Sequence, residues 1–339
     1  MPMYDDLYIR DLLGETGEYP TKSATLMYCP DIICWGVEPL PDAQTFLAKN
    51  YDQTWYRNPV RKQKNYVYVR AKNLYPGRRA GQVHLYYAPG GTLADIRSWR
   101  DNHVGTAIPG QDFVKLDAER GEVVSGDTAF VWTPPESQAL AHYCFVARLS
   151  TEDHPNPLPE SFADYNAYLQ WVADNPALGW RNIDVVSTQS PPSYQGDFLM
   201  TNLETREREF LFVLDGAKLP KDTLMQMFCA ASGPNPPVDS SGHATGRDRS
   251  QITATAFLPA NFSANFTTTI TLPSGHSWTP AMSVRIEQYA ITNERDGAFL
   301  RALSRPIHEI AAHDVSSPVP RHGTAARLGS FTVQFTDQG

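Results

Sequence analysis

The sequence of 339 residues predicts an all-β protein made of two β-sandwich domains that are joined by one helix. Three observations lead to this fold class. Short segments in which apolar and polar residues alternate recur in both halves of the chain, as they do in half-buried antiparallel strands. The 27 prolines and 22 glycines supply many turns. The length exceeds that of one sandwich domain and suits two.

Residues 1–27 are expected to form an acidic N-terminal extension without a core of its own. In the first twenty residues one cation, Arg10, stands against five acids: Asp5, Asp6, Asp11, Glu15 and Glu18. Such a segment is ordered only when it lies on another surface. The side chains that would make this contact are Tyr4, Leu7 and Tyr8.

The start of the chain also bears on localisation, which the sequence leaves unknown. It has neither the basic region nor the apolar region of a secretory signal peptide. No run of 18 apolar residues suggests a membrane span. We expect synthesis in the cytoplasm, with any export following a non-classical route.

Residues 28–152 are expected to form the first sandwich. The segments 65–73 and 82–87 both alternate and flank a Pro76-Gly77 turn, which predicts a β-hairpin. The predicted buried set is Val67, Val69, Val83, Leu85, Trp132 and Val146, and the predicted outward set is Tyr66, Arg70 and Lys72.

Four motifs in this half carry a resemblance to a known family. They are Tyr-Val-Tyr-Val-Arg-Ala-Lys-Asn-Leu at 66–74, Gly-Gln-Val-His-Leu-Tyr-Tyr-Ala at 81–88, Val-Trp-Thr-Pro at 131–134 and His-Tyr-Cys-Phe-Val-Ala-Arg at 142–148. Together they resemble the bacterial immunoglobulin-like domains of the CARDB type, named for cell adhesion. The resemblance implies an immunoglobulin-like sandwich used for adhesion, spacing or assembly, and it brings no catalytic residues with it.

Residues 153–180 are expected to form a linker that contains the helix. The stretch 161–175 has apolar residues at helical spacing, with Ser161 as the predicted cap, and Pro176 ends it. Residues 181–339 are again rich in strand patterns, so a second immunoglobulin-like sandwich is predicted there. The stretch 232–250, rich in glycine, proline and serine, is expected to be a loop.

Charge is distributed unevenly along the chain. The segment 53–94 contains no acid and eight basic residues, although the whole chain has a formal charge of −8. A solvated outer sheet face is one explanation. The other is an interface for an acidic protein, because tyrosine and arginine anchor interfaces. Nucleic acid is an unlikely partner for a chain of net negative charge.

The interface hypothesis combines the acidic extension with the basic segment. Residues 1–20 would dock on a neighbouring subunit and build a homo-oligomer or a larger assembly, although the extension could also fold back on its own subunit. The proposed interface residues are Tyr4, Leu7, Tyr8, Tyr66, Tyr68, Arg70, Lys72, Arg78 and Arg79.

The sequence offers no catalytic signature, and we expect no enzyme, no cofactor and no metal site. His308 and His313 are five residues apart and so do not share a helix face as metalloprotease ligands do. His84 and His142 are interpreted as structural. The four cysteines are expected to be buried free thiols. Two alternatives remain open, a pore-forming or toxin-associated protein, and a carbohydrate- or surface-binding module that uses Trp55, Tyr56 and Trp278.

Overall fold

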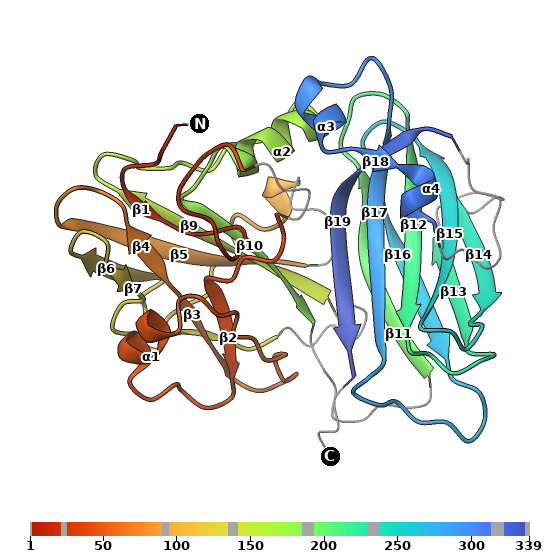
Figure 1. Ribbon diagram of the computed structural model, residues 1–339, viewed down its shortest axis with the longest axis horizontal. Coiled ribbons are helices and arrows are strands. Elements are labelled where there is room, and N and C mark those ends of the chain that lie inside the picture. The colour runs from red at the N-terminus through yellow and green to blue at the C-terminus, as the bar shows by residue number, and fades with distance from the viewer. Residues whose placement is uncertain are drawn as a thin grey trace.

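The computed structural model describes residues 2–21, 26–89, 95–134, 142–184, 193–229, 237–312 and 322–335. Its sheets are antiparallel throughout, and they form two sandwich-like halves that lie side by side (Figure 1). The prediction of an all-β fold is confirmed. The described helices are short: α1 (Ala43–Lys49), α2 (Tyr165–Ala173), α3 (Ala298–Ala302) and α4 (Ile307–Ile310), with one 3₁₀ turn, η1 (Ile96–Ser98).

The first half places one four-stranded sheet against two three-stranded sheets. The four-stranded sheet has the order β10 (Leu178–Asp184), β9 (His142–Thr151), β5 (Arg79–Pro89) and β6 (Phe113–Ala118). The smaller sheets are β2 (Ile32–Gly36), β3 (Asn65–Val69) and β8 (Phe130–Trp132), and β1 (Leu7–Tyr8), β4 (Ala71–Asn73) and β7 (Val123–Val124).

The predicted hairpin between 65–73 and 82–87 is wrong in its pairing. The first segment forms β3 and β4, whose partners are β2, β8, β1 and β7, whereas the second lies in β5 between β6 and β9. Val67 and Val83 nevertheless face the same core, fully buried, from opposite sheets. The turn at Pro76-Gly77 therefore carries the chain from one sheet to the other, and alternation alone cannot distinguish this arrangement from a hairpin.

The N-terminal extension packs on its own chain. Leu7 and Tyr8 pair as β1 with β4, and the backbone N–H of Ile9 donates to the carbonyl of Pro176 at 2.8 Å. Leu7, Tyr8 and Ile9 are each at most 2% exposed. Of the two arrangements that the sequence left open, the structure shows the one in which the extension folds back.

The second half is a sandwich of a four-stranded and a five-stranded sheet. The first has the order β11 (Ser193–Asn202), β16 (Phe262–Thr271), β13 (Leu224–Cys229) and β14 (Val238–His243). The second has the order β15 (Arg249–Leu258), β12 (Arg208–Ala217), β17 (Ser283–Thr292), β19 (Thr324–Gln334) and β18 (Arg305–Pro306). Strand β14 lies within the stretch 232–250 that was expected to be a loop, because its sequence Val-Asp-Ser-Ser-Gly-His gives little apolar signal.

The junction differs from the prediction in two details. Helix α2 begins after Asp164, whose side chain accepts a hydrogen bond from the N–H of Ala167, so Asp164 and not Ser161 is the cap. Strand β10 pairs with β9 along its whole length, so residues 181–184 belong to the sheet of the first half. One hydrophobic cluster runs from Tyr168 and Trp180 into the core of the second half.

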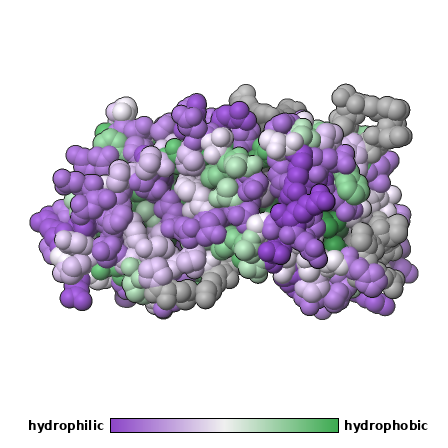
Figure 2. Space-filling view, turned by 90° about the horizontal axis from the view of Figure 1, so that it is seen from above, coloured by the Kyte–Doolittle hydropathy of each residue, from purple (hydrophilic) through white to green (hydrophobic). Residues whose placement is uncertain are grey.

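The surface is mostly polar. Figure 2 shows small hydrophobic areas that are separated by hydrophilic ones on the face seen from above. No helix in the part of the chain that the structure describes combines the length and the apolar character needed to cross a membrane.

Candidate functional site

The basic segment 53–94 does not form one outward stripe, because its central arginine is buried. Arg70 is 0% exposed, and its Nε donates to Oδ1 of Asp31 at 2.7 Å. Its other N–H groups donate to four backbone carbonyls, those of Pro30, Leu47, Asn50 and Gln53. The prediction that Arg70 points outward is wrong, since the segment 30–53 covers this face of the strand.

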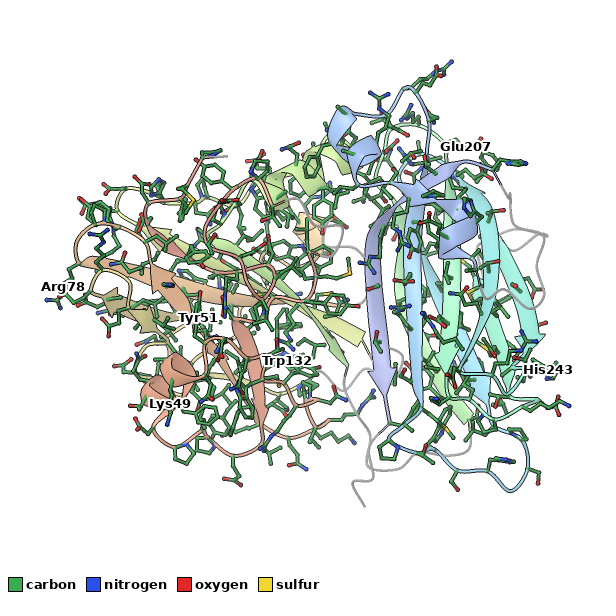
Figure 3. All side chains as sticks on the ribbon, viewed as in Figure 1. Lys49, Tyr51, Arg78, Trp132, Glu207 and His243 are labelled. Carbon is green, nitrogen blue, oxygen red and sulfur yellow. The ribbon has the colours of Figure 1, made fainter. Side chains whose placement is uncertain are left out.

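The extension supplies a second arginine to the same carboxylate. Nη2 of Arg10 lies 2.6 Å from Oδ1 of Asp31, and the guanidinium stacks 3.4 Å from the ring centre of Tyr51. The amine of Lys72 lies 5.9 Å from the same ring. Figure 3 labels Tyr51, which lies inside the first half. Asp31 thus ties the extension and the strand at Arg70 together.

A second ion cluster fixes the start of the extension. Asp6, 0% exposed, accepts hydrogen bonds from Oγ1 of Thr151 at 2.5 Å and lies 2.6 Å from Nδ1 of His154. Arg79 lies 3.2 Å from Asp6 and 2.5 Å from Asp153. The acids and bases that were expected to attract each other between subunits therefore meet within one chain.

The predicted interface residues fall into three groups. Leu7, Tyr8, Tyr68 and Arg70 are buried in their own chain, so their assignment to an intermolecular surface is corrected. Tyr4, Tyr66, Lys72 and Arg79 are partly exposed. The side chain of Arg78 is 67% exposed and forms a bidentate ion pair with Asp117. It points outward at the far end of the first half (Figure 3).

Half-buried aromatic rings gather where α1 covers the sheet of β2, β3 and β8. The ring centres of Trp35, Phe46 and Trp55 are 5.1 to 6.1 Å apart. The exposed Arg57 lies over Trp35, with its guanidinium carbon 4.6 Å from the ring centre. We call Trp35, Phe46, Trp55 and Arg57 the aromatic patch. Sequence reasoning found only Trp55, because the other rings come from separate elements.

The three residues of the carbohydrate alternative do not form one site. Trp55 belongs to the aromatic patch, whereas Tyr56 lies against the guanidinium of buried Arg181 at 4.5 Å. Trp278 stacks on Phe335 in the second half, with ring centres 3.7 Å apart and planes 9° apart. Tyr56 and Trp278 thus each use one ring face within the chain, and Trp55 packs against Trp35 and Phe46.

Two histidines and one aspartate come together beside β6, the edge strand of the four-stranded sheet of the first half. His84 on β5, His103 after η1 and Asp112 before β6 have ligand atoms that all lie within 4.8 Å of one another. Burial lowers the pKa of His84, and the charges of Arg148 and His103 act in the same direction, whereas Asp112 opposes them. His103 and Asp112 were not singled out from the sequence, because their loops gave no pattern.

A cavity of about 740 Å³ lies at one end of the second half, beside Glu207 (Figure 3). Its lining mixes both charges, with Arg206, Arg208 and Arg295 beside Glu207, Glu209 and Glu294. Arg208 is held by Glu204 and Asp296, which makes it a structural anchor of this end. Burial raises the pKa of the Glu209 carboxyl. Among the residues that the structure describes, the lining includes no serine, cysteine or histidine.

Comparison with known proteins identifies no relative of this chain. No family model matches, and no curated protein matches in sequence. Solved structures give weak similarities. A transglutaminase from red sea bream has a TM-score of 0.22 and 11% identity, and the match covers 69% of this chain and 28% of that one. The chain thus spans less than a third of the transglutaminase.

Two further structures are similarly distant. A mutant of the CFA/I adhesin CfaE from enterotoxigenic E. coli has a TM-score of 0.19 and 7% identity, with 87% of this chain and 90% of the adhesin covered. Vicilin from hazelnut, Corylus avellana, has a TM-score of 0.12 and 10% identity, with 69% of this chain and 80% of vicilin covered. At these scores none of the three contributes to an argument about function.

Proposed function

We propose that this chain is a non-enzymatic binding protein that associates with further copies of itself through the aromatic patch. The observation that carries the proposal is the position of Arg57 over the half-buried rings of Trp35, Phe46 and Trp55. Tryptophan and arginine dominate the binding energy of protein interfaces, and partly buried anchors lose little side-chain freedom on binding.

The ring geometry favours a protein partner over a sugar. Phe46 meets Trp35 and Trp55 at interplanar angles of 69° and 63°, so the rings pack edge to face. Arg57 covers part of one face of Trp35. The patch therefore has an irregular surface that a protein side chain can fill, and it lacks the flat coplanar rings on which a sugar would stack.

Charge supports a second copy as the partner. Arg70, Arg78 and Arg79 are neutralised by acids of their own chain. The described ion pairs include none of four exposed basic residues of the segment 49–64, which also contains Trp55: Lys49, Arg57, Lys62 and Lys64. The chain has a net charge of −8. Acids outnumber bases on every copy, and an acidic area of one copy that faces these four cations of another would favour association in a fixed register.

Sedimentation velocity of the full-length chain tests the proposal. We expect association at micromolar concentration and low salt, weakened by high salt, because the contact is partly electrostatic. Arg57→Glu should shift the protein to the monomer. Arg120→Glu, which makes the same charge change on an exposed turn outside the patch, should leave the association unchanged. A wild-type chain that stays monomeric, or an Arg57→Glu variant that associates like the wild type, would overturn the proposal.

A further inference from the structure

The cluster of His84, His103 and Asp112 has the donor atoms and the spacing of a metal site. It is the only group of this kind among the residues that the structure describes. Two imidazoles and one carboxylate suit zinc and similar divalent transition metals, whereas calcium and magnesium prefer sites made of oxygen alone.

Backbone pairing fixes the three residues relative to one another. His84 on β5 is the register partner of Phe113 on β6, and Asp112 directly precedes Phe113. An isolated bridge pairs His103 with Tyr86, two residues along β5 from His84. The three side chains therefore come from three segments that are hydrogen-bonded to each other, and the site needs little ordering when a metal binds.

One distance between ligand atoms already matches a tetrahedral ion. Zinc lies about 2.0–2.2 Å from nitrogen and oxygen ligands, which places neighbouring ligand atoms about 3.4 Å apart. Nδ1 of His103 and Oδ2 of Asp112 are 3.4 Å apart. The third ligand atom, from His84, lies within 4.8 Å of both, so a small side-chain rotation completes the set.

The His84 ring has a backbone hydrogen bond with Asp112, and Nδ1 is the ring nitrogen left without a hydrogen-bond partner among the described residues. This nitrogen is buried. An unpaired buried nitrogen costs free energy, and a bond to a metal would remove this cost. The side chains of His103 and Asp112 are 38% and 49% exposed, so an ion can enter from solvent.

One cation opposes a metal at this position. Arg148 on β9 is the register partner of His84, and its charge acts on that ring. Its Nη1, however, donates to the carbonyl of Asn156 at 3.0 Å, which directs the guanidinium toward that loop. Asp112 supplies the negative charge that offsets the ion.

We propose that His84, His103 and Asp112 bind one divalent transition-metal ion of the zinc type, with a fourth position open to water. The ion would join the segment after η1 to strands β5 and β6. This inference is independent of the aromatic patch, which lies on the sheet of β2, β3 and β8 in the same half.

Calorimetric titration of the full-length chain with zinc chloride, after treatment with a chelator, tests the site. Visible absorption with cobalt(II) provides a second readout, because tetrahedral coordination gives a characteristic spectrum. We expect one equivalent to bind, and we expect His103→Ala and Asp112→Asn each to raise the dissociation constant at least about tenfold. His276→Ala, which removes an exposed histidine of the second half, should have no effect.

The buried cysteines do not interfere with this measurement in the folded chain. Circular dichroism shows whether each variant is folded. We expect both variants to fold, because the side chains of His103 and Asp112 are partly exposed. Absence of zinc binding by the wild type at millimolar concentration would overturn the proposal. Equal affinity of the wild type and His103→Ala would also overturn it, because it would show binding at scattered surface groups.

Discussion

Replacing Asp31 by asparagine should destabilise the first half more than any exposed charge change. The carboxylate is 0% exposed and is the acid that both Arg10 and Arg70 contact. It accepts four hydrogen bonds of 2.6 to 3.0 Å, three from Arg10 and one from Arg70. Asparagine keeps one oxygen acceptor and turns an N–H₂ group toward the remaining donors.

The size of the effect follows from burial. Removing one partner of a buried ion pair costs about 3–5 kcal/mol, because the remaining charge is left without compensation in a medium of low polarity. Hydrogen bonds to a charged group contribute about 1.5–3 kcal/mol each, so the loss of the two bonds at one oxygen gives a similar figure. Backbone carbonyls still bind Arg70, which prevents a larger loss.

Urea unfolding followed by circular dichroism measures the change. Asp117→Asn is the matched control, because Asp117 also binds an arginine through two oxygens but is exposed, and its unfolding midpoint should not move. Limited proteolysis should cut the extension of Asp31→Asn faster than that of the wild type. A loss below about 1 kcal/mol would show that Asp31 does not hold the extension in place.

Three further predictions concern the same half and the thiols. Gly179→Ala places a methyl group 2.7 Å from Ile9 and 2.8 Å from Cys29. Overpacking of this kind should lower the free energy of unfolding in urea by about 1–3 kcal/mol. An unchanged unfolding midpoint would contradict the packing of the extension on β10. Burial and the neighbouring Glu15 raise the pKa of Asp11 well above its usual range, so the folded chain binds this proton more tightly than the unfolded chain. Ionised Asp11 destabilises the fold by its full amount above the folded pKa, and the effect vanishes below the unfolded pKa of about 3.9. Asp11→Asn should therefore be more stable than the wild type at about pH 8, with an advantage that shrinks toward about pH 4. An equal difference in stability between variant and wild type at the two pH values would refute this. Burial raises the pKa of the Cys34 thiol to about 12. A thiol reagent should label the four buried cysteines, Cys29, Cys34, Cys144 and Cys229, only after denaturation. Fast labelling of the folded chain would contradict their burial.

The sequence by itself determined where most strands lie and which of their aliphatic residues face the core of the first half. Val67, Val69, Val83 and Leu85 are buried as predicted, because side chains alternate between the two faces of any strand, whatever its partner. The helix at the junction was also predictable, since apolar residues at helical spacing between a cap and a proline leave few alternatives.

Tertiary structure alone decided which strands pair and which charges are buried. Arg70 follows the pattern of an outward residue, yet the distant segment 30–53 covers it and supplies Asp31 and four carbonyls. The aromatic patch and the cluster of His84, His103 and Asp112 likewise gather side chains from separate elements. Local sequence specifies the period of each strand, but the partner of a strand depends on long-range contacts that no local pattern contains.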